Sequence, residues 1–97
     1  MEFIDNTLIE DFSNDGAVLC KGIFLDWINP LRIGIDKLIQ NPSVRERSYT
    51  PKDGTASFFQ DLVNWDRIPE FNDFIFKSNI GFYAAKLMKS KKSRFFH

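Results

Sequence analysis

The fold is decided by the stretch TLIEDFSNDGAVLCKG, residues 7–22, where the pattern of a helix gives way to the pattern of a strand. Thr7 and Glu10 form a T-x-x-E capping box, in which the hydroxyl and the carboxylate satisfy N–H groups at the start of a helix. Gly16 then supplies the residue that tolerates a left-handed backbone at a helix end. The stretch therefore predicts a helix at about residues 7–15.

A short apolar run follows this helix between two glycines. Val18, Leu19 and Cys20 lie side by side, which is typical of a strand that is buried on both faces. We therefore predict a strand at residues 17–22. Cys20 is interpreted as a core thiol, with a reactive thiol as the alternative. A single cysteine can form neither an internal disulfide nor a Cys-rich zinc site.

The middle of the chain predicts a second helix, a loop and a second strand. Asn29-Pro30 is a suitable pair for a helix start, some helical turn can precede it, and Asn41-Pro42 ends the helix. Residues 42–54 are polar, contain two prolines and predict a loop. The Lys-Asp-Gly turn at the end of this loop leads into a predicted strand at residues 55–63.

The last third of the chain predicts a helical region followed by a strand. Trp65-Asp66 opens the region, Ser78 or Asn79 can cap a further helical segment that runs to Met88, and a strand begins at 93–97. The fold class predicted from these elements is α+β, with three helical regions and about three short strands that need partner strands. The chain is interpreted as one incomplete domain spanning residues 1–97.

Composition and charge exclude several classes of protein. The chain has 97 residues with 13 basic and 13 acidic side chains, so its formal net charge is zero. A nucleic-acid binder usually carries an excess of positive charge, and no apolar run approaches the length of a membrane span. The N-terminus lacks the pattern of a signal peptide. These features predict a cytoplasmic protein that has neither nucleic acid nor membrane as a partner.

The sequence is poorly equipped for catalysis on its own. It contains no G-x-G-x-x-G, P-loop, G-x-S-x-G or C-x-x-C motif, and its single histidine is His97. Histidine is the commonest proton-transfer group near neutral pH and the commonest metal ligand. The sequence therefore predicts no catalytic residue and no metal ligand within this chain.

The order of the elements resembles the N-terminal part of the phytanoyl-CoA dioxygenase (PhyH) family. Residues 9–24, IEDFSNDGAVLCKGIF, are similar to that family's N-terminal segment, and Phe12 and Gly16 match its F-x-x-x-G spacing. Residues 57–65, SFFQDLVNW, resemble the second strand and the tryptophan that begins the next helical region. The helix at 79–88 and the strand that begins at Arg94 come in the expected order.

The resemblance implies a fold, a chemistry and cofactors for a full-length parent enzyme. Members of this family are double-stranded β-helix (jelly-roll or cupin-like) oxygenases that depend on Fe(II) and 2-oxoglutarate, and two histidines and one carboxylate hold the iron. Their H-x-D motif is expected after the strand that begins at Arg94, so His97 is not predicted to be an iron ligand. Iron, 2-oxoglutarate and a small-molecule substrate are thus implied only for the parent. This chain is predicted to be a structural segment that is inactive alone.

Two residues of the predicted 55–63 strand are candidates for cofactor binding in that parent. Phe58 and Gln60 share one strand face, which could approach the cosubstrate or substrate pocket. Some family members place a cosubstrate-contacting lysine where Phe58 stands here. Core packing for Phe58 and a surface amide for Gln60 is the alternative. The loop at 42–54 is either a substrate lid or an ordinary surface loop.

A different class of function is compatible with the same sequence. Strand edges that lack a neighbour favour pairing with another chain. The alternative interpretation is therefore a small non-catalytic protein-interaction module that forms a homo-oligomer through exposed strand edges.

Overall fold

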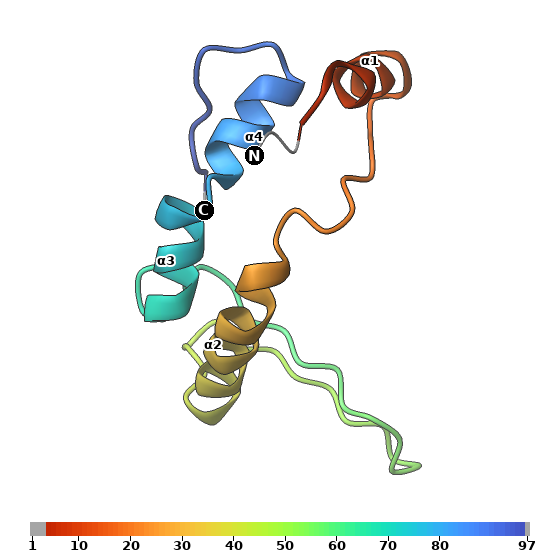
Figure 1. The fold of residues 1–97 in the computed structure, drawn as a ribbon. Coiled ribbons are helices and arrows are strands. Elements are labelled where there is room, and N and C mark those ends of the chain that lie inside the picture. Colours follow the sequence, from red (N-terminus) through yellow and green to blue (C-terminus); the bar gives the residue numbers. More distant parts are fainter. Residues whose placement is uncertain (1–3, 97) are drawn as a thin grey trace.

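The computed structural model describes residues 4–96, which form helices joined by extended segments (Figure 1). Helix α2 packs against α3, α3 packs against α4, and α4 packs against α1, so the helices form a chain of neighbours. In chain order the elements are α1 (Asn6–Asp15), the 3-10 turn η1 (Leu25–Trp27), α2 (Ile28–Gln40), α3 (Pro69–Lys77) and α4 (Ile80–Leu87).

The predicted α+β fold class with about three strands is wrong. Among residues 4–96 the only β-type pairing is a single antiparallel bridge between Tyr49 and Phe58. The predicted strands at 17–22 and 93–96 are extended or turn segments without a paired neighbour, and the 55–63 strand is reduced to that bridge. A strand is stable only when another strand satisfies its backbone groups. His97 lies outside the described residues.

The first helix ends as predicted but begins earlier. Gly16 has a φ of 76°, and its N–H donates to the Phe12 carbonyl at 2.9 Å. At the other end the Asp5 carboxylate accepts a hydrogen bond from the Leu8 N–H at 2.9 Å. Asp5 is therefore the N-cap, and the capping box predicted at Thr7 is wrong. A carboxylate is a strong cap because it also interacts favourably with the positive end of the helix.

The later helix boundaries follow from the prolines and from a side-chain cap. Turn η1 runs directly into α2, so that helix begins at Ile28, and Pro30 lies in its first turn where no N–H is needed. Helix α3 begins at Pro69 for the same reason. Before α4, Asn79 has a φ of 67°, and the Ile80 N–H donates to the Ser78 hydroxyl at 3.3 Å.

The contact between α2 and α3 is close because α2 has a glycine there. A Cβ on Gly34 would lie 2.8 Å from a ring carbon of Phe71 and 3.1 Å from the Glu70 Cβ. Beside it the Lys37 ammonium donates to the Glu70 carboxylate at 2.7 Å. The absence of a side chain at Gly34 therefore sets how near the two helices approach.

The core of the described chain is small for its length. The buried apolar residues are Ile4, Leu38, Ile68 and Ala85. The accessible surface is 7737 Å², whereas a compact protein of this mass exposes about 5,700 Å². The radius of gyration is 16.5 Å, against about 12.5 Å for a compact chain of this length. The chain thus exposes about 2,000 Å² more surface than a compact domain.

Candidate functional site

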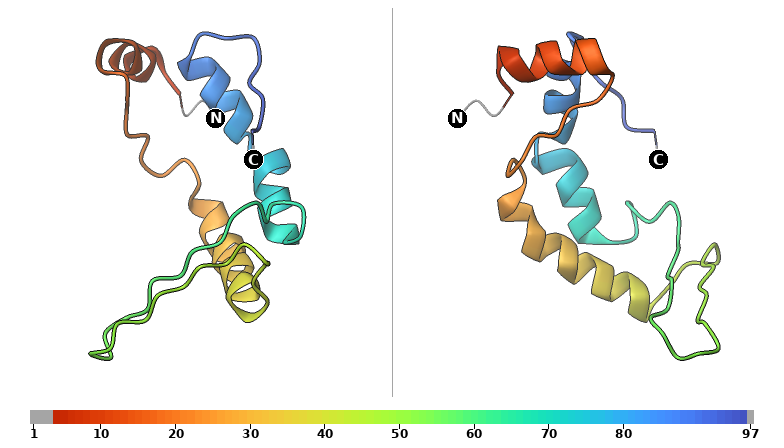
Figure 2. Two further views of the ribbon diagram at one scale, coloured as in Figure 1. Left: turned by 180° about the vertical axis from the view of Figure 1, so that it is seen from behind. Right: turned by 90° about the vertical axis from the view of Figure 1, so that its right-hand side faces the viewer.

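The most distinctive surface is a hairpin, residues 43–63, whose two legs lie side by side and project away from the helices (Figures 1 and 2). Tyr49 and Phe58 exchange both of their backbone hydrogen bonds, at 2.8 and 2.7 Å. The Arg47 N–H donates to the Gln60 carbonyl at 2.9 Å in the same register. We call residues 45–50 the first leg and residues 55–62 the second leg.

The tip of the hairpin is a tight turn at Pro51–Gly54. The Gly54 N–H donates to the Pro51 carbonyl at 3.2 Å, and Gly54 has a φ of 78°, a conformation that glycine adopts without strain. The Asp53 carboxylate accepts from the Thr55 N–H at 3.0 Å and from its hydroxyl at 2.8 Å. These hydrogen bonds from Thr55 lower the pKa of Asp53.

The base of the hairpin is fastened by polar side chains. The Asp61 carboxylate accepts from the Ser43 N–H at 2.7 Å and from the Ser43 hydroxyl at 2.5 Å. Desolvation opposes ionisation of Asp61, but hydrogen bonds from Ser43, with those from Leu62 and Asn64, together hold the pKa of this carboxyl well below its usual range. The Arg45 guanidinium donates to the carbonyls of Leu62 and Val63, each at 2.8 Å. Both legs are therefore tied together where they leave the helices.

A second set of bonds fixes the hairpin to the end of α2. The Arg67 guanidinium donates to the Asn41 carbonyl at 3.0 Å and to the side-chain oxygen of Asn64 at 3.0 and 3.1 Å. Asn64 is buried, and its amide donates to the Leu62 carbonyl at 3.1 Å. The position of the hairpin relative to α2 is thus set by hydrogen bonds and not by apolar packing alone.

The two candidate cofactor residues, Phe58 and Gln60, lie on the second leg of this hairpin. Phe58 is 62% exposed and stands opposite Tyr49, which is 65% exposed. Gln60 is also exposed. The structure therefore brings Phe58 together with Tyr49 on an open surface, and does not place Phe58 and Gln60 in an enclosed pocket.

The described residues do not fit the iron site that the resemblance implies for the parent. No three side chains of histidine, cysteine, aspartate or glutamate within 4–96 are grouped so that they could hold a metal ion. Cys20 is a half-buried free thiol.

A second apolar surface lies where α3 and α4 meet the C-terminal segment. The Trp65 ring makes edge-to-face contacts with Phe76 and Phe95, with centroids 5.9 and 5.5 Å apart. An open groove of about 400 Å³ runs beside them, lined by Ile80, Met88 and other residues.

Within the described chain, no helix is both long and apolar enough to cross a bilayer.

In comparisons with known proteins, no family model, curated protein or solved structure matches the chain. The PhyH resemblance therefore stays a prediction.

The sequence analysis did not predict the pairing of residues 45–50 with 55–62, because it interprets residues 42–54 only as a loop. A signal was present in Lys52-Asp53-Gly54, a turn sequence flanked by strand-forming residues on both sides.

Proposed function

We propose that this chain is a non-catalytic structural segment of a PhyH-like, Fe(II)- and 2-oxoglutarate-dependent oxygenase, and that it is inactive alone. The resemblance of residues 9–24 and 57–65 supports the family. In this proposal, other parts of the parent enzyme hold the iron and 2-oxoglutarate. The role of this segment is to present apolar surface that the remainder of the parent covers.

One observation carries the proposal. The segments that resemble family strands are extended and expose large apolar side chains: Leu19 is 72% exposed, Phe58 is 62% exposed and Leu62 is 58% exposed. Burying a side chain of this size stabilises a protein by about 1.5–3 kcal/mol. Exposure at these positions, together with the small core, favours a chain whose apolar surface is covered by further polypeptide.

The coding DNA after codon 97 tests the family. We expect an in-frame H-x-D motif within a few dozen codons. A stop codon at that point, together with a native protein of the mass of this chain, would contradict the oxygenase proposal.

An iron titration of the purified chain tests inactivity. Under anaerobic conditions with 2-oxoglutarate present, we expect no stoichiometric Fe(II) binding, and we expect no succinate after oxygen is admitted. A tight one-to-one iron site with succinate formation would show that the chain is an enzyme by itself.

A small protein-interaction module is the second candidate function. The hairpin favours it, since both of its legs leave an outer backbone edge exposed to other chains. A stop codon after codon 97 would favour this candidate over the oxygenase segment.

A further inference from the structure

The two outer edges of the hairpin present free backbone groups. In an antiparallel pair, alternate residues direct their N–H and C=O groups toward the partner strand, and the residues between them direct these groups outward. Tyr49 and Phe58 bond to each other, so their neighbours along each leg face outward. No backbone hydrogen bond between described residues engages the outward groups of Ser48, Thr50, Ser57 and Phe59.

The two edges differ in how well they are protected against pairing. The first leg and its turn read RERSYTPK, residues 45–52, with four charged side chains and Pro51. The second leg reads TASFFQDL over residues 55–62, without proline; its one charged residue, Asp61, lies at the base, where Ser43 binds its carboxylate, and TASFFQ carries no charge. Charged residues and proline prevent edge-to-edge pairing of strands, so only the second leg is open to a further strand.

We infer that the second leg pairs in antiparallel orientation with the same leg of a second copy of this chain. The inference rests on the second candidate function, the protein-interaction module; in the oxygenase proposal the remainder of the parent covers this surface instead. Pairing of the outward groups sets Ser57 opposite Phe59 of the second copy, and Phe58 opposite Phe58. The contact is two-fold symmetric, with the same surface used on both chains.

Charge and side-chain complementarity select a second copy as the partner. When the TASFFQ segments of two copies pair, no like charges stand opposite each other. The net charge of the whole chain is zero, so two copies do not repel each other through their net charge. Phe58 would stand against its own copy in a closely spaced pair, and Tyr49 flanks it on the same face. The result is a row of four aromatic rings made from side chains that are 65% and 62% exposed in the single chain.

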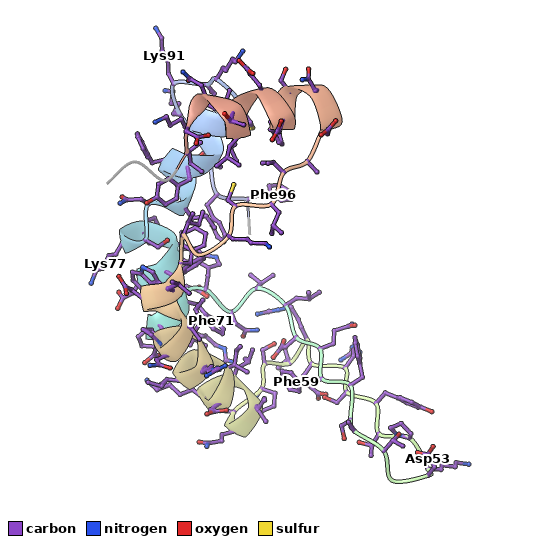
Figure 3. All side chains as sticks on the ribbon, turned by 45° about the vertical axis from the view of Figure 1, so that its right-hand side comes forward. Asp53, Phe59, Phe71, Lys77, Lys91 and Phe96 are labelled. Carbon is purple, nitrogen blue, oxygen red and sulfur yellow. The ribbon has the colours of Figure 1, made fainter. Side chains whose placement is uncertain are left out.

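The whole chain exposes more surface than a stable pair needs to bury, and the second leg is one part of that surface. A stable association buries about 800 Å² on each partner. This chain exposes about 2,000 Å² more than a compact domain of its mass. The hairpin projects away from the helices, with Asp53 at its tip and Phe59 on the second leg nearer to α2 (Figure 3).

Sedimentation velocity with two matched lysine variants tests the inference. The Thr50 and Ser57 hydroxyls hydrogen-bond to each other at 2.7 Å, so Ser57→Lys and Thr50→Lys lose the same bond and add the same charge on opposite edges. We expect the wild-type mass to rise from 11.3 kDa toward twice that value with concentration. Ser57→Lys should raise the concentration at which half of the chains are paired by at least about tenfold. Thr50→Lys should leave that concentration unchanged.

A disulfide test in a Cys20→Ser background checks the register. The Cα atoms of the closely spaced Phe58 pair would be about 4.5 Å apart, within the range of a disulfide. We expect Phe58→Cys to cross-link two chains under mild oxidation. Tyr49→Cys is the control, because three strand spacings of about 4.8 Å would separate its two copies.

Several results would overturn the inference. The first is a wild-type chain that stays monomeric at all concentrations. The second is equal association of the Ser57→Lys and Thr50→Lys variants. The third is cross-linking of Tyr49→Cys that is as efficient as that of Phe58→Cys. Helical circular dichroism of each variant confirms that the helices are retained. None of these results bears on the coding-DNA and iron tests, so failure of the pairing is distinguishable from failure of the oxygenase proposal.

Discussion

Ser43 and Asp61 are joined by two hydrogen bonds, from the Ser43 N–H at 2.7 Å and from its hydroxyl at 2.5 Å, across 18 residues of sequence. Together they close the base of the hairpin. The Arg45 guanidinium adds two bonds at the same place, so the base reinforces the backbone hydrogen bonds that join the legs further along.

The first prediction concerns the pH dependence of this pair. The pKa of Asp61 is lowered in the folded chain, so its ionised form stabilises the hairpin above the unfolded pKa of about 3.9. This stabilisation is lost as the pH falls through the folded pKa. We expect the NMR shift of the Ser43 amide to be constant from neutral pH to about pH 4, and to change only below it.

The same pair is tested at neutral pH by Asp61→Asn. A neutral amide is a weaker acceptor than a carboxylate, so hydrogen exchange of the Tyr49 and Phe58 amides should accelerate. Asp66→Asn, on an exposed side chain outside the hairpin, is the control. Equal exchange rates in the two variants would show that Asp61 does not hold the legs together.

The second prediction concerns Glu70. The hydrogen bond from Lys37 lowers the pKa of Glu70, and the second carboxylate oxygen is buried without a hydrogen-bond partner among the described residues. The pair therefore stabilises the α2–α3 contact at neutral pH, and this effect is lost as the pH falls through the folded pKa. Lys37→Met should raise the pKa of Glu70 in a carbon-13 NMR titration. Lys77→Met, which removes the 3.2 Å pair with Asp73, should leave the Glu70 titration unchanged.

The third prediction concerns the glycine between α2 and α3. Alanine favours a helix by about 1 kcal/mol over glycine, but at Gly34 its Cβ would lie 2.8 Å from the Phe71 ring. Forcing a side chain into a filled space costs about 1–3 kcal/mol. Gly34→Ala should therefore lower the urea unfolding midpoint, whereas Asp36→Ala at an exposed position of the same helix should not. A more stable Gly34→Ala variant would mean that the helices separate readily.

The fourth prediction concerns Trp65, which joins α3 to the C-terminal segment through Phe76 and Phe95. Each such aromatic pair contributes about 0.5–1.5 kcal/mol. Trp65→Leu should therefore release residues 91–96 and accelerate their hydrogen exchange as measured by mass spectrometry. Trp27→Leu is the matched control, since Trp27 contacts Phe74 instead. Unchanged exchange in Trp65→Leu would show that other contacts hold the segment.

The helices were predictable from the sequence because their signals are local. Gly16 stops α1, and the prolines at Pro30 and Pro69 mark the first turns of α2 and α3. Each of these effects depends on the backbone of the residue itself and its near neighbours. The Asp5 cap was missed because Thr7 and Glu10 offered a second plausible start two residues later.

The strands were not predictable because a strand depends on a distant partner. Val18 to Cys20 have the composition of a buried strand, but no neighbour pairs with them in the described chain. At the candidate site, Phe58 and Gln60 lie on the second leg, which forms an isolated bridge at Phe58 and not the predicted strand. The exposed position of Phe58 could not be predicted, because it depends on how residues 43–63 leave the helices.

The unequal protection of the two hairpin edges limits how far assembly can proceed. A strand pair with both edges uncharged can add further copies without end and grow into a filament. Here Arg45, Glu46, Arg47 and Pro51 block the first leg, so once the second leg is occupied the hairpin offers no further open edge. The charges of a single leg would thereby keep this aromatic-rich chain from polymerising.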